Sequence, residues 1–266
     1  MTKFGRAIGF AVFVFLTAIG SACAEAIVER PDLDALFVEQ GMPGTFVLLD
    51  AATERMIVVN RARAEKRTVP ASTFKIANSL IALETSAVKD EHEIIPYGGK
   101  PQMIKEWERD MGMRDAIRIS NVPVYQEIAR RIGPDRMQAM LDRLDYGNHT
   151  IGTVVDRFWL DGPLQISPVE QARFLAKLAK RQLSLSARTQ AIVRDIIRLD
   201  VAKGAILYGK TGWAASTTPN VGWLVGWVER GEKIDSFALN VDMATVQDAP
   251  KRMILVRGML SKLGVM

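Results

Sequence analysis

Apolar positions along the chain follow two periods, one typical of strands near both ends and one typical of helices in between. Residues 44–61 form two β-rich runs around a polar turn at 52–54, which predicts a β-hairpin. Residues 221–243 repeat this design around a turn at Gly231. A short β-branched and aromatic run at 205–213 directly precedes this second hairpin. We therefore expect these segments to form neighbouring antiparallel strands.

Three- and four-residue spacings of apolar side chains predict helices through the middle of the chain. Residues 72–85 carry apolar side chains around much of the helical circumference, as a buried helix does. The Gly-Pro pair at 133–134 divides the next helical region into two helices. Ser167 begins another helix, with proline at its first position and Glu170 completing a capping box. A last helix is predicted over residues 251–264.

This order of strands, helices, strands and a last helix predicts an α+β fold. We expect an antiparallel sheet that is flanked by helices and built from both ends of the chain, with an all-helical lobe inserted. The predicted sheet lobe comprises residues 25–70 and 185–266, and the predicted helical lobe comprises residues 71–184. We expect the active site at the junction of the two lobes.

Residues 1–24 have the layout of a secretory signal peptide. Lys3 and Arg6 supply a positive start, an apolar run follows at 7–20, and alanine flanks Cys23 on both sides. The apolar run is too short to span a membrane comfortably, and no later segment reaches spanning length. We expect an exported, periplasmic protein. A lipid anchor at Cys23 is the less favoured alternative, because its flank Gly20-Ser21-Ala22 lacks the aliphatic residue usual at such sites.

Composition and charge narrow the possible chemistry. The chain has 266 residues, of which 48% are hydrophobic, enough for one large domain or two interlocked ones. Loss of the signal peptide would remove Lys3 and Arg6 and no acidic residue, so the formal net charge would fall from +5 to +3. This balance, without a run of basic residues, disfavours nucleic-acid binding. With Cys23 removed and only His92 and His149 present, we expect no disulfide, no metal site and no Ser-His-Asp triad.

The segment 204–213, GAILYGKTGW, fits two unrelated motifs. It matches the phosphate-binding P-loop, and Lys210, Thr211 and Gly212 also match the K-T-G motif of enzymes that acylate a serine with penicillin-like substrates. A P-loop needs a helix that opens at its lysine, whereas here a glycine and strand-forming residues follow. The context therefore favours K-T-G.

Ser72 and Lys75 match S-x-x-K, a pattern that a chain of this length contains about once by chance. A second match, Ser86 with Lys89, lies in a polar segment. Ser72 instead opens a buried helix, where residues three apart share one face, so Lys75 can reach its hydroxyl. The helix N-terminus also favours developing negative charge. Taken alone, Ser72 would be an ordinary helix cap.

The remaining short motifs also have ordinary structural explanations when each is taken alone. Ser120 begins an S-x-V motif just before a helix, and Lys210 could be a surface lysine with its stem on apolar neighbours. The Tyr-Gly-Asn sequence at 146–148 could be a turn. Trp159, followed by Leu-Asp-Gly, could be a core residue.

Together and in this order, the motifs resemble those of the class D serine β-lactamases, the oxacillin-hydrolysing family. The resemblance covers nearly the whole chain after the signal peptide, and residues 70–84, 100–133 and 158–167 carry most of it. Val122 supports class D, because class A enzymes have S-D-N at this place. The resemblance implies the two-lobe fold shared with penicillin-binding proteins and hydrolysis of the cyclic amide of a small-molecule β-lactam.

The resemblance also implies a role for each matching residue. Ser72 would be the nucleophile that forms an acyl-enzyme, and the backbone N–H groups of Ser72 and Trp213 would form the oxyanion hole. Ser120 would pass a proton to the departing lactam nitrogen. Lys210 and Thr211 would bind the substrate carboxylate. Two further residues complete this set: Gly212, which would let the strand approach closely, and Arg252, a second carboxylate anchor.

Lys75 needs a physical argument, because a protonated amine cannot accept the serine proton. Its apolar neighbours in the sequence predict a lowered pKa, and a neutral amine can react with CO2. The resemblance implies that outcome, a carbamylated lysine that acts as general base and needs CO2 or bicarbonate but no other cofactor. Trp159 would donate its indole N–H to the carbamate, and Val122 and Leu160 would wall the pocket.

Two other functions fit the same fold. A β-lactam sensor would be acylated at Ser72 and would then stall. A peptidoglycan transpeptidase or carboxypeptidase would use the same S-x-x-K and K-T-G motifs. Rapid deacylation distinguishes the hydrolase from both. The sequence leaves open the substrate spectrum and the choice between monomer and homodimer.

Overall fold

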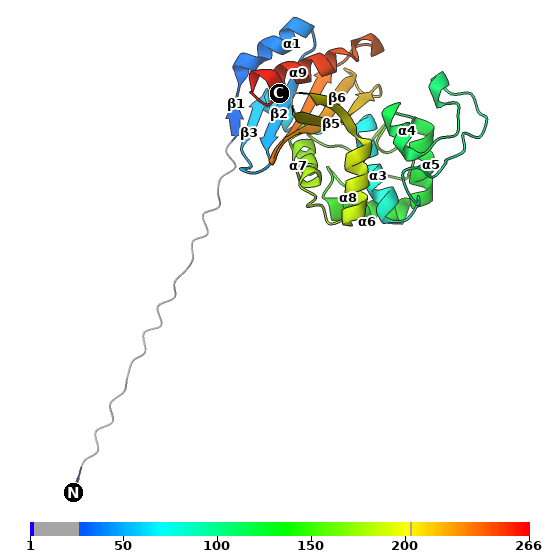
Figure 1. The fold of residues 1–266 in the computed structure, drawn as a ribbon, viewed down its shortest axis with the longest axis horizontal. Coiled ribbons are helices and arrows are strands. Elements are labelled where there is room, and N and C mark those ends of the chain that lie inside the picture. Colours follow the sequence, from blue (N-terminus) through cyan, green and yellow to red (C-terminus); the bar gives the residue numbers. More distant parts are fainter. Residues whose placement is uncertain (3–26, 203) are drawn as a thin grey trace.

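A seven-stranded sheet built from both ends of the chain forms the centre of the molecule (Figure 1). The computed structural model describes residues 1–2, 27–202 and 204–266, so most of the predicted signal peptide, including Cys23, lies outside the described residues. The strands are β1 (Ile27–Glu29), β2 (Gly44–Asp50), β3 (Met56–Val59), β4 (Arg198–Ala202), β5 (Ala205–Ala214), β6 (Val221–Arg230) and β7 (Lys233–Asp242). Their order across the sheet is β1-β3-β2-β7-β6-β5-β4.

Both predicted hairpins are confirmed. Strands β2 and β3 pair antiparallel, as do β6 and β7, and β5 lies antiparallel beside β6. Strand β1 differs from the expectation of a purely antiparallel sheet, because it pairs parallel to β3. The chain between β1 and β3 runs through η1, α1 and β2 and is long enough to join parallel strands.

The helices of the described residues include all those predicted from apolar spacing, and several short ones besides. The α-helices are α1 (Asp34–Gln40), α2 (Arg61–Ala64), α3 (Lys75–Glu84), α4 (Met113–Arg118), α5 (Val122–Ile132), α6 (Pro134–Leu144), α7 (Pro168–Ala179), α8 (Ala187–Ile196) and α9 (Lys251–Lys262). The 3-10 helices are η1 (Pro31–Leu33), η2 (Ala71–Phe74), η3 (Lys105–Trp107) and η4 (Val246–Asp248). The predicted capping box at the start of α7 is present.

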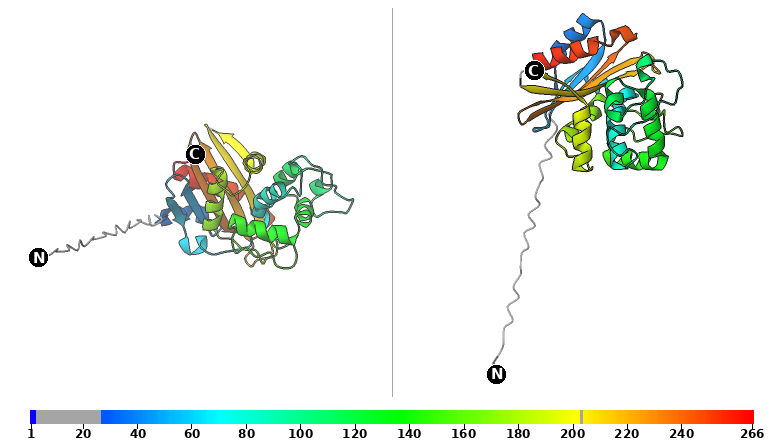
Figure 2. Two further views of the ribbon diagram at one scale, coloured as in Figure 1. Left: turned by 90° about the horizontal axis from the view of Figure 1, so that it is seen from below. Right: turned by 45° about the vertical axis from the view of Figure 1, so that its right-hand side comes forward.

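The sheet separates two hydrophobic cores (Figure 2). Along β2, Phe46 and Leu48 belong to the core shared with α1 and α9. Val47 and Leu49 point to the opposite face and belong to the core shared with α7 and the helical lobe. Successive side chains of a strand alternate between faces, so an unbroken apolar run identifies a strand that is buried on both sides.

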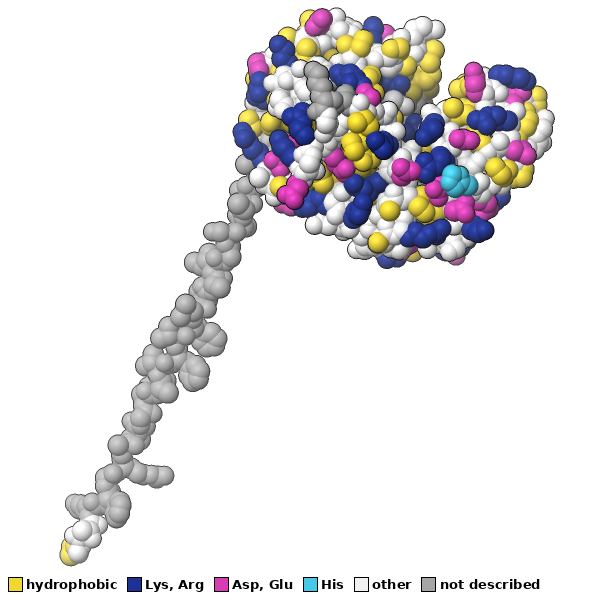
Figure 3. All heavy atoms as spheres, in the orientation of Figure 1, with side chains coloured by type: hydrophobic (Ala, Val, Ile, Leu, Met, Phe, Trp, Pro, Cys, Tyr) yellow, Lys and Arg dark blue, Asp and Glu magenta, His cyan; other side chains and the backbone are white. Residues whose placement is uncertain are grey.

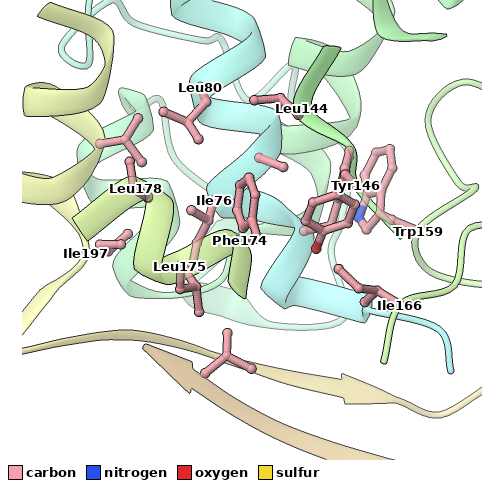
Figure 4. Packing of buried hydrophobic residues seen from close by; sticks show 14 of the residues in the cluster. Ile76, Leu80, Leu144, Tyr146, Trp159, Ile166, Phe174, Leu175, Leu178 and Ile197 are labelled. Carbon is pink, nitrogen blue, oxygen red and sulfur yellow. The ribbon is translucent and has the colours of Figure 1, made fainter. Parts of the chain in front are cut away.

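Helix α3 is the buried centre of the helical lobe, and nine of its ten residues are buried, from Lys75 through Leu83. Its side chains Ile76 and Leu80 lie among residues of α7 and α6, including Leu175 and Leu144 (Figure 4). Because α3 is enclosed on most sides, a residue at its first turn has a fixed position relative to the sheet. The nucleophile predicted from the sequence lies directly before this turn.

The two predicted lobes share helices. Helix α7 packs on β7, β2 and β6, whereas α8 packs on α3, α4 and α7. These contacts cross the predicted boundary at 184/185, because α7 covers the sheet and α8 covers the helical lobe. The bounds 25–70, 71–184 and 185–266 therefore stay a prediction.

Gly226 allows β5 and β6 to approach closely, and this leads to a stability prediction. A Cβ atom at Gly226 would lie 1.9 Å from the carbonyl oxygen of Tyr208. Because the obstructing atom is backbone, Gly226→Ala should lower the free energy of unfolding by about 3 kcal/mol or more, the upper end of overpacking costs. Urea denaturation would measure this change. Gly258→Ala is the matched control, because its Cβ would make only ordinary contacts on helix α9 and should raise stability by about 0.5–1 kcal/mol. Equal stability of the wild type and Gly226→Ala would contradict the prediction.

Candidate active site

The predicted site residues gather where the helical lobe meets the edge of β5. Strand β4 pairs only with residues 205–208 of β5, so the later part of that edge has no strand partner among the described residues. The segment η2 packs there instead, and a Cβ atom at Gly212 would lie 3.1 Å from the carbonyl oxygen of Pro70. The molecular surface is hollowed between the sheet and the side formed by α4 and α5 (Figure 3). The backbone of β5 therefore lies close to η2 at Gly212.

Ser72 and Lys75 form the centre of this arrangement. The side-chain nitrogen Nζ of Lys75 lies 2.8 Å from the Ser72 hydroxyl oxygen Oγ. Ser72 is half-buried at η2, and Lys75 opens α3, so the two residues lie one helical turn apart. The residue before the nucleophile, Ala71, has a left-handed backbone with φ of 48°. Such strain at a non-glycine residue persists only where the surrounding fold imposes it.

Lys75 is a buried amine without an acidic partner. Its side chain is fully buried, and among the described residues it forms no ion pair with a carboxylate. Burial first, and then the nearby positive charge of Lys210, hold the pKa of Lys75 well below its ordinary value. The Tyr125 ring lies 5.3 Å from Nζ. A lysine in these surroundings is readily neutral, and a neutral amine can accept a proton or react with an electrophile.

Ser120 and Lys210 form a second pair across the two lobes. Nζ of Lys210 donates to the Ser120 hydroxyl at 3.1 Å and to the Thr211 carbonyl oxygen at 3.1 Å. Burial, together with the charge of Arg252, lowers the pKa of Lys210 to about 7. The site thus presents two serine hydroxyls and several basic groups, a combination that suits an anionic substrate attacked by a hydroxyl.

Arg252 lies next to the K-T-G strand, and most of its hydrogen bonds go to backbone. Its Nη1 donates to the Gly212 carbonyl oxygen at 2.5 Å and to the Trp223 carbonyl oxygen at 3.3 Å, while Nε donates to the Ala249 carbonyl oxygen. Two of its three nitrogen atoms therefore hold backbone, and only Nη2 has no hydrogen bond to a described residue. Burial lowers the pKa of Arg252 to about 10. Trp213, which follows Gly212 in β5, is 37% exposed.

Trp159 is fully buried, and its indole Nε1 has no hydrogen-bond partner within the described part of the chain. Its ring centroid lies 5.5 Å from that of Phe74, the residue before Lys75, and 5.0 Å from that of Phe158. An orphaned donor in the interior is costly and usually signals a missing partner. Leu160 packs half-buried against the same core, and Val122 is half-buried at the first position of α5.

The motifs did not identify the residues that hold Lys75 and the turn of Ser72 in place. Ser79 donates to the Lys75 carbonyl oxygen at 2.7 Å and shares a hydrogen bond of 2.8 Å with the Tyr125 hydroxyl. Gln171 donates to the Thr73 hydroxyl at 2.8 Å. Polar residues at buried positions of apolar helices were the available signal, because such groups need partners.

Two searches of the described residues gave negative results. Across residues 27–202 and 204–266, no helix is both long and apolar enough to cross a membrane. Within the same ranges, no three side chains of His, Cys, Asp or Glu are grouped as metal ligands would be.

Comparison with known proteins gives relatives along most of the chain. Residues 44–256 match the family model of the penicillin binding protein transpeptidase domain. β-Lactamase OXA-19 of Pseudomonas aeruginosa is 38% identical over 260 residues, which cover 96% of this chain and 98% of the relative. β-Lactamase OXA-48 of Klebsiella pneumoniae is 40% identical over 253 residues, covering 95% and 96% respectively.

A solved structure extends the similarity to the fold. The crystal structure of FUS-1 (OXA-85), a class D β-lactamase from Fusobacterium nucleatum subsp. polymorphum, matches with a TM-score of 0.87 and 39% identity. The match covers 90% of this chain and all of that one. Sequence identity and shape each agree over at least 90% of the chain, and the resemblance drawn from the motifs is confirmed: the chain belongs to the class D β-lactamase family.

Proposed function

We propose that the protein hydrolyses β-lactam antibiotics through an acyl-enzyme on Ser72 and thereby confers resistance to them. The observation that carries this proposal is the hydrogen bond of 2.8 Å between Ser72 and a buried lysine that has no acidic partner among the described residues. A serine hydroxyl is a weak nucleophile unless a nearby base removes its proton. The relatives named above are β-lactamases, which supports the same chemistry here.

Acylation would use groups from both lobes. Lys75 accepts the Ser72 proton as Oγ attacks the lactam carbonyl carbon, and the backbone N–H groups of Ser72 and Trp213 bind the resulting oxyanion. The C–N bond of the ring then breaks, and Ser120 passes a proton to the nitrogen. Lys210 stands 3.1 Å from Ser120 and can resupply that proton. The products of this step are an ester on Ser72 and an opened ring.

The surroundings of Lys75 fit a carbamate on its Nζ. The amine is buried and without an acidic partner, and the orphaned Nε1–H of Trp159 is available to a new acceptor. When CO2 adds to the amine, the carbamate supplies an oxygen base. Phe74 and Trp159 are fully buried and would exclude water around this position, and Val122 and Leu160 would wall it. Lys75 so modified would also activate the water that hydrolyses the acyl-enzyme.

The substrate carboxylate would lie against the K-T-G strand. Nζ of Lys210 lies 3.4 Å from the Thr211 hydroxyl, and Nη2 of Arg252 is the nitrogen of that side chain that has no hydrogen bond to described backbone. We propose that Arg252 both holds the strand and contributes one hydrogen bond to the carboxylate, rather than a two-nitrogen fork. Export to the periplasm would bring the enzyme to its substrates.

The test is hydrolysis of a chromogenic β-lactam by the chain from residue 25 onward, with and without bicarbonate. We expect rapid turnover that bicarbonate stimulates. Turnover should fall as the pH is lowered, because protonation of Lys75 removes the neutral amine that accepts a proton and binds CO2. The lowered pKa of Lys75 places this loss below the ordinary lysine range.

The outcomes separate the proposed function from its rivals. A single stoichiometric burst with bicarbonate present would show acylation without release, as expected of a sensor or a transpeptidase. Turnover that ignores both bicarbonate and acidification would contradict the carbamate and leave the hydrolase in place.

A further inference from the structure

Ser120 has a backbone conformation that its own sequence does not favour. Its φ is 57°, in the left-handed region, and it lies between the end of α4 and the start of α5. Two backbone hydrogen bonds close this turn, from Ser120 N to the Ile117 carbonyl oxygen at 3.3 Å and from Asn121 N to the Ala116 carbonyl oxygen at 2.8 Å. A β-carbon makes this region unfavourable, so further contacts must stabilise it.

Trp107 bonds to the chain on both sides of Ser120. Its indole Nε1 donates to the carbonyl oxygen of Ile119 at 3.2 Å, and its own carbonyl oxygen accepts from Nδ2 of Asn121 at 3.4 Å. Trp107 is 8% exposed and Asn121 is fully buried. Trp107 thus holds the residues on both sides of Ser120, Ile119 through its backbone and Asn121 through its side chain.

Asn121 uses its whole side-chain amide in this arrangement. Besides Trp107, its Nδ2 contacts the sulfur of Met111 at 3.4 Å, while Oδ1 accepts from the backbone N–H of Val124 at 3.0 Å and caps α5. A serine at this position could still cap the helix but could not reach the Trp107 carbonyl oxygen. The capping function and the bridging function can therefore be separated by substitution.

We propose that Trp107 and Asn121 are positioning residues that hold the left-handed backbone of Ser120, so that its hydroxyl meets the ammonium group of Lys210. The inference rests on the proposed function, in which Ser120 transfers a proton to the lactam nitrogen. Neither residue touches the reacting atoms in this scheme, and both act through Ser120. A cavity of about 480 Å³, lined by both residues, adjoins this bridge, so a truncated side chain there can be replaced by water.

The test is the acylation rate constant of a chromogenic β-lactam, measured as the pre-steady-state burst. Trp107→Phe removes the indole donor and Asn121→Ser removes the bridge while keeping the cap. Each substitution should slow acylation about tenfold, the loss expected for one or two hydrogen bonds. In a Ser120→Ala background, the same substitutions should change the rate by less than about twofold, because they act through the missing hydroxyl. Trp227→Phe, which removes an indole bond to Glu229 on β6, is the control and should leave acylation unchanged.

Equal slowing in both backgrounds would overturn the inference, since Trp107 and Asn121 would then support the fold in general. No slowing by Asn121→Ser in the wild-type background would overturn it as well. If Trp107→Phe does not fold, Asn121→Ser decides the question alone. Failure of the wild type to be acylated would instead reject the proposed function, so the two failures are distinguishable.

Discussion

Replacing Lys75 with methionine is expected to reduce β-lactam turnover by about 10²–10⁴-fold, the contribution typical of a general base. Methionine has a similar length and fills the same buried space, so the packing of α3 should survive. Ser72 would keep its place in η2 but would lose the nitrogen that lies 2.8 Å from its hydroxyl. Steady-state hydrolysis of a chromogenic β-lactam in saturating bicarbonate measures the effect.

The same substitution should also change how stability depends on pH. Burial holds the pKa of Lys75 well below its ordinary value of 10.5, so the unfolded chain binds a proton there that the folded chain does not. Wild-type stability is therefore lost as the pH falls through the window between 10.5 and the lowered pKa. Without this group, Lys75→Met should become more stable relative to wild type as the pH falls through that window.

Urea denaturation of both proteins in CO2-free buffer, at about pH 6 and about pH 10, measures the sign of this change in relative stability. Lys180→Met is the matched control, because Nζ of Lys180, at the end of α7, donates to the Ala51 carbonyl oxygen and bonds to none of the site residues described. That variant should keep full turnover. Unchanged turnover in Lys75→Met would remove Lys75 from the mechanism, and a stability difference independent of pH would contradict its burial as a neutral amine.

Trp159→Phe is expected to reduce turnover about 10- to 100-fold without added bicarbonate, and bicarbonate should restore much of it. Phenylalanine keeps the aromatic packing on Phe74 and Phe158 but removes the indole N–H. A hydrogen bond to a charged group contributes about 1.5–3 kcal/mol, so a carbamate on Lys75 would lose CO2 correspondingly more easily. Initial rates over a bicarbonate titration give the concentration for half-maximal activity, which should rise by the same factor.

Stability should change little in this variant. Loss of the larger ring costs packing energy, whereas loss of an orphaned buried donor removes an unfavourable desolvation of about 1–3 kcal/mol. The control Trp227→Phe removes an indole that is already bonded to Glu229 and should leave the bicarbonate dependence unchanged. A loss of activity in Trp159→Phe that bicarbonate cannot relieve would mean that Trp159 only packs the core.

Local pattern was enough to predict the principal elements. Both hairpins, the helix break at Gly133 and the capping box at Ser167 follow from side-chain period and turn chemistry, which act over a few residues. Helices α1, α4 and α8 were not predicted, because each has at most ten residues and so offers few repeats of the helical period. The parallel pairing of β1 with β3 was also missed, since pairing between distant segments leaves no local signal.

The left-handed conformations of Ala71 and Ser120 could not be predicted either. Nothing in the local sequence favours a positive φ at alanine or serine, and contacts with distant residues impose it. The hydrogen bonds of Arg252 to backbone could not be predicted for the same reason. Its sequence position suggested a free guanidinium for the substrate, but folding places the carbonyl oxygens of Gly212 and Trp223 within its reach.

The sequence by itself determined the α+β order of elements, the ordered motifs and hence the family, because these depend on residue types and short spacings. Only the tertiary structure decided that, within the described part of the chain, Lys75 is buried without an acidic partner and the Trp159 indole N–H has no acceptor, and that Trp107 bonds on both sides of Ser120. These properties depend on which groups are absent from a neighbourhood as much as on which are present. A neighbourhood formed by segments far apart in the chain exists only after they have packed together.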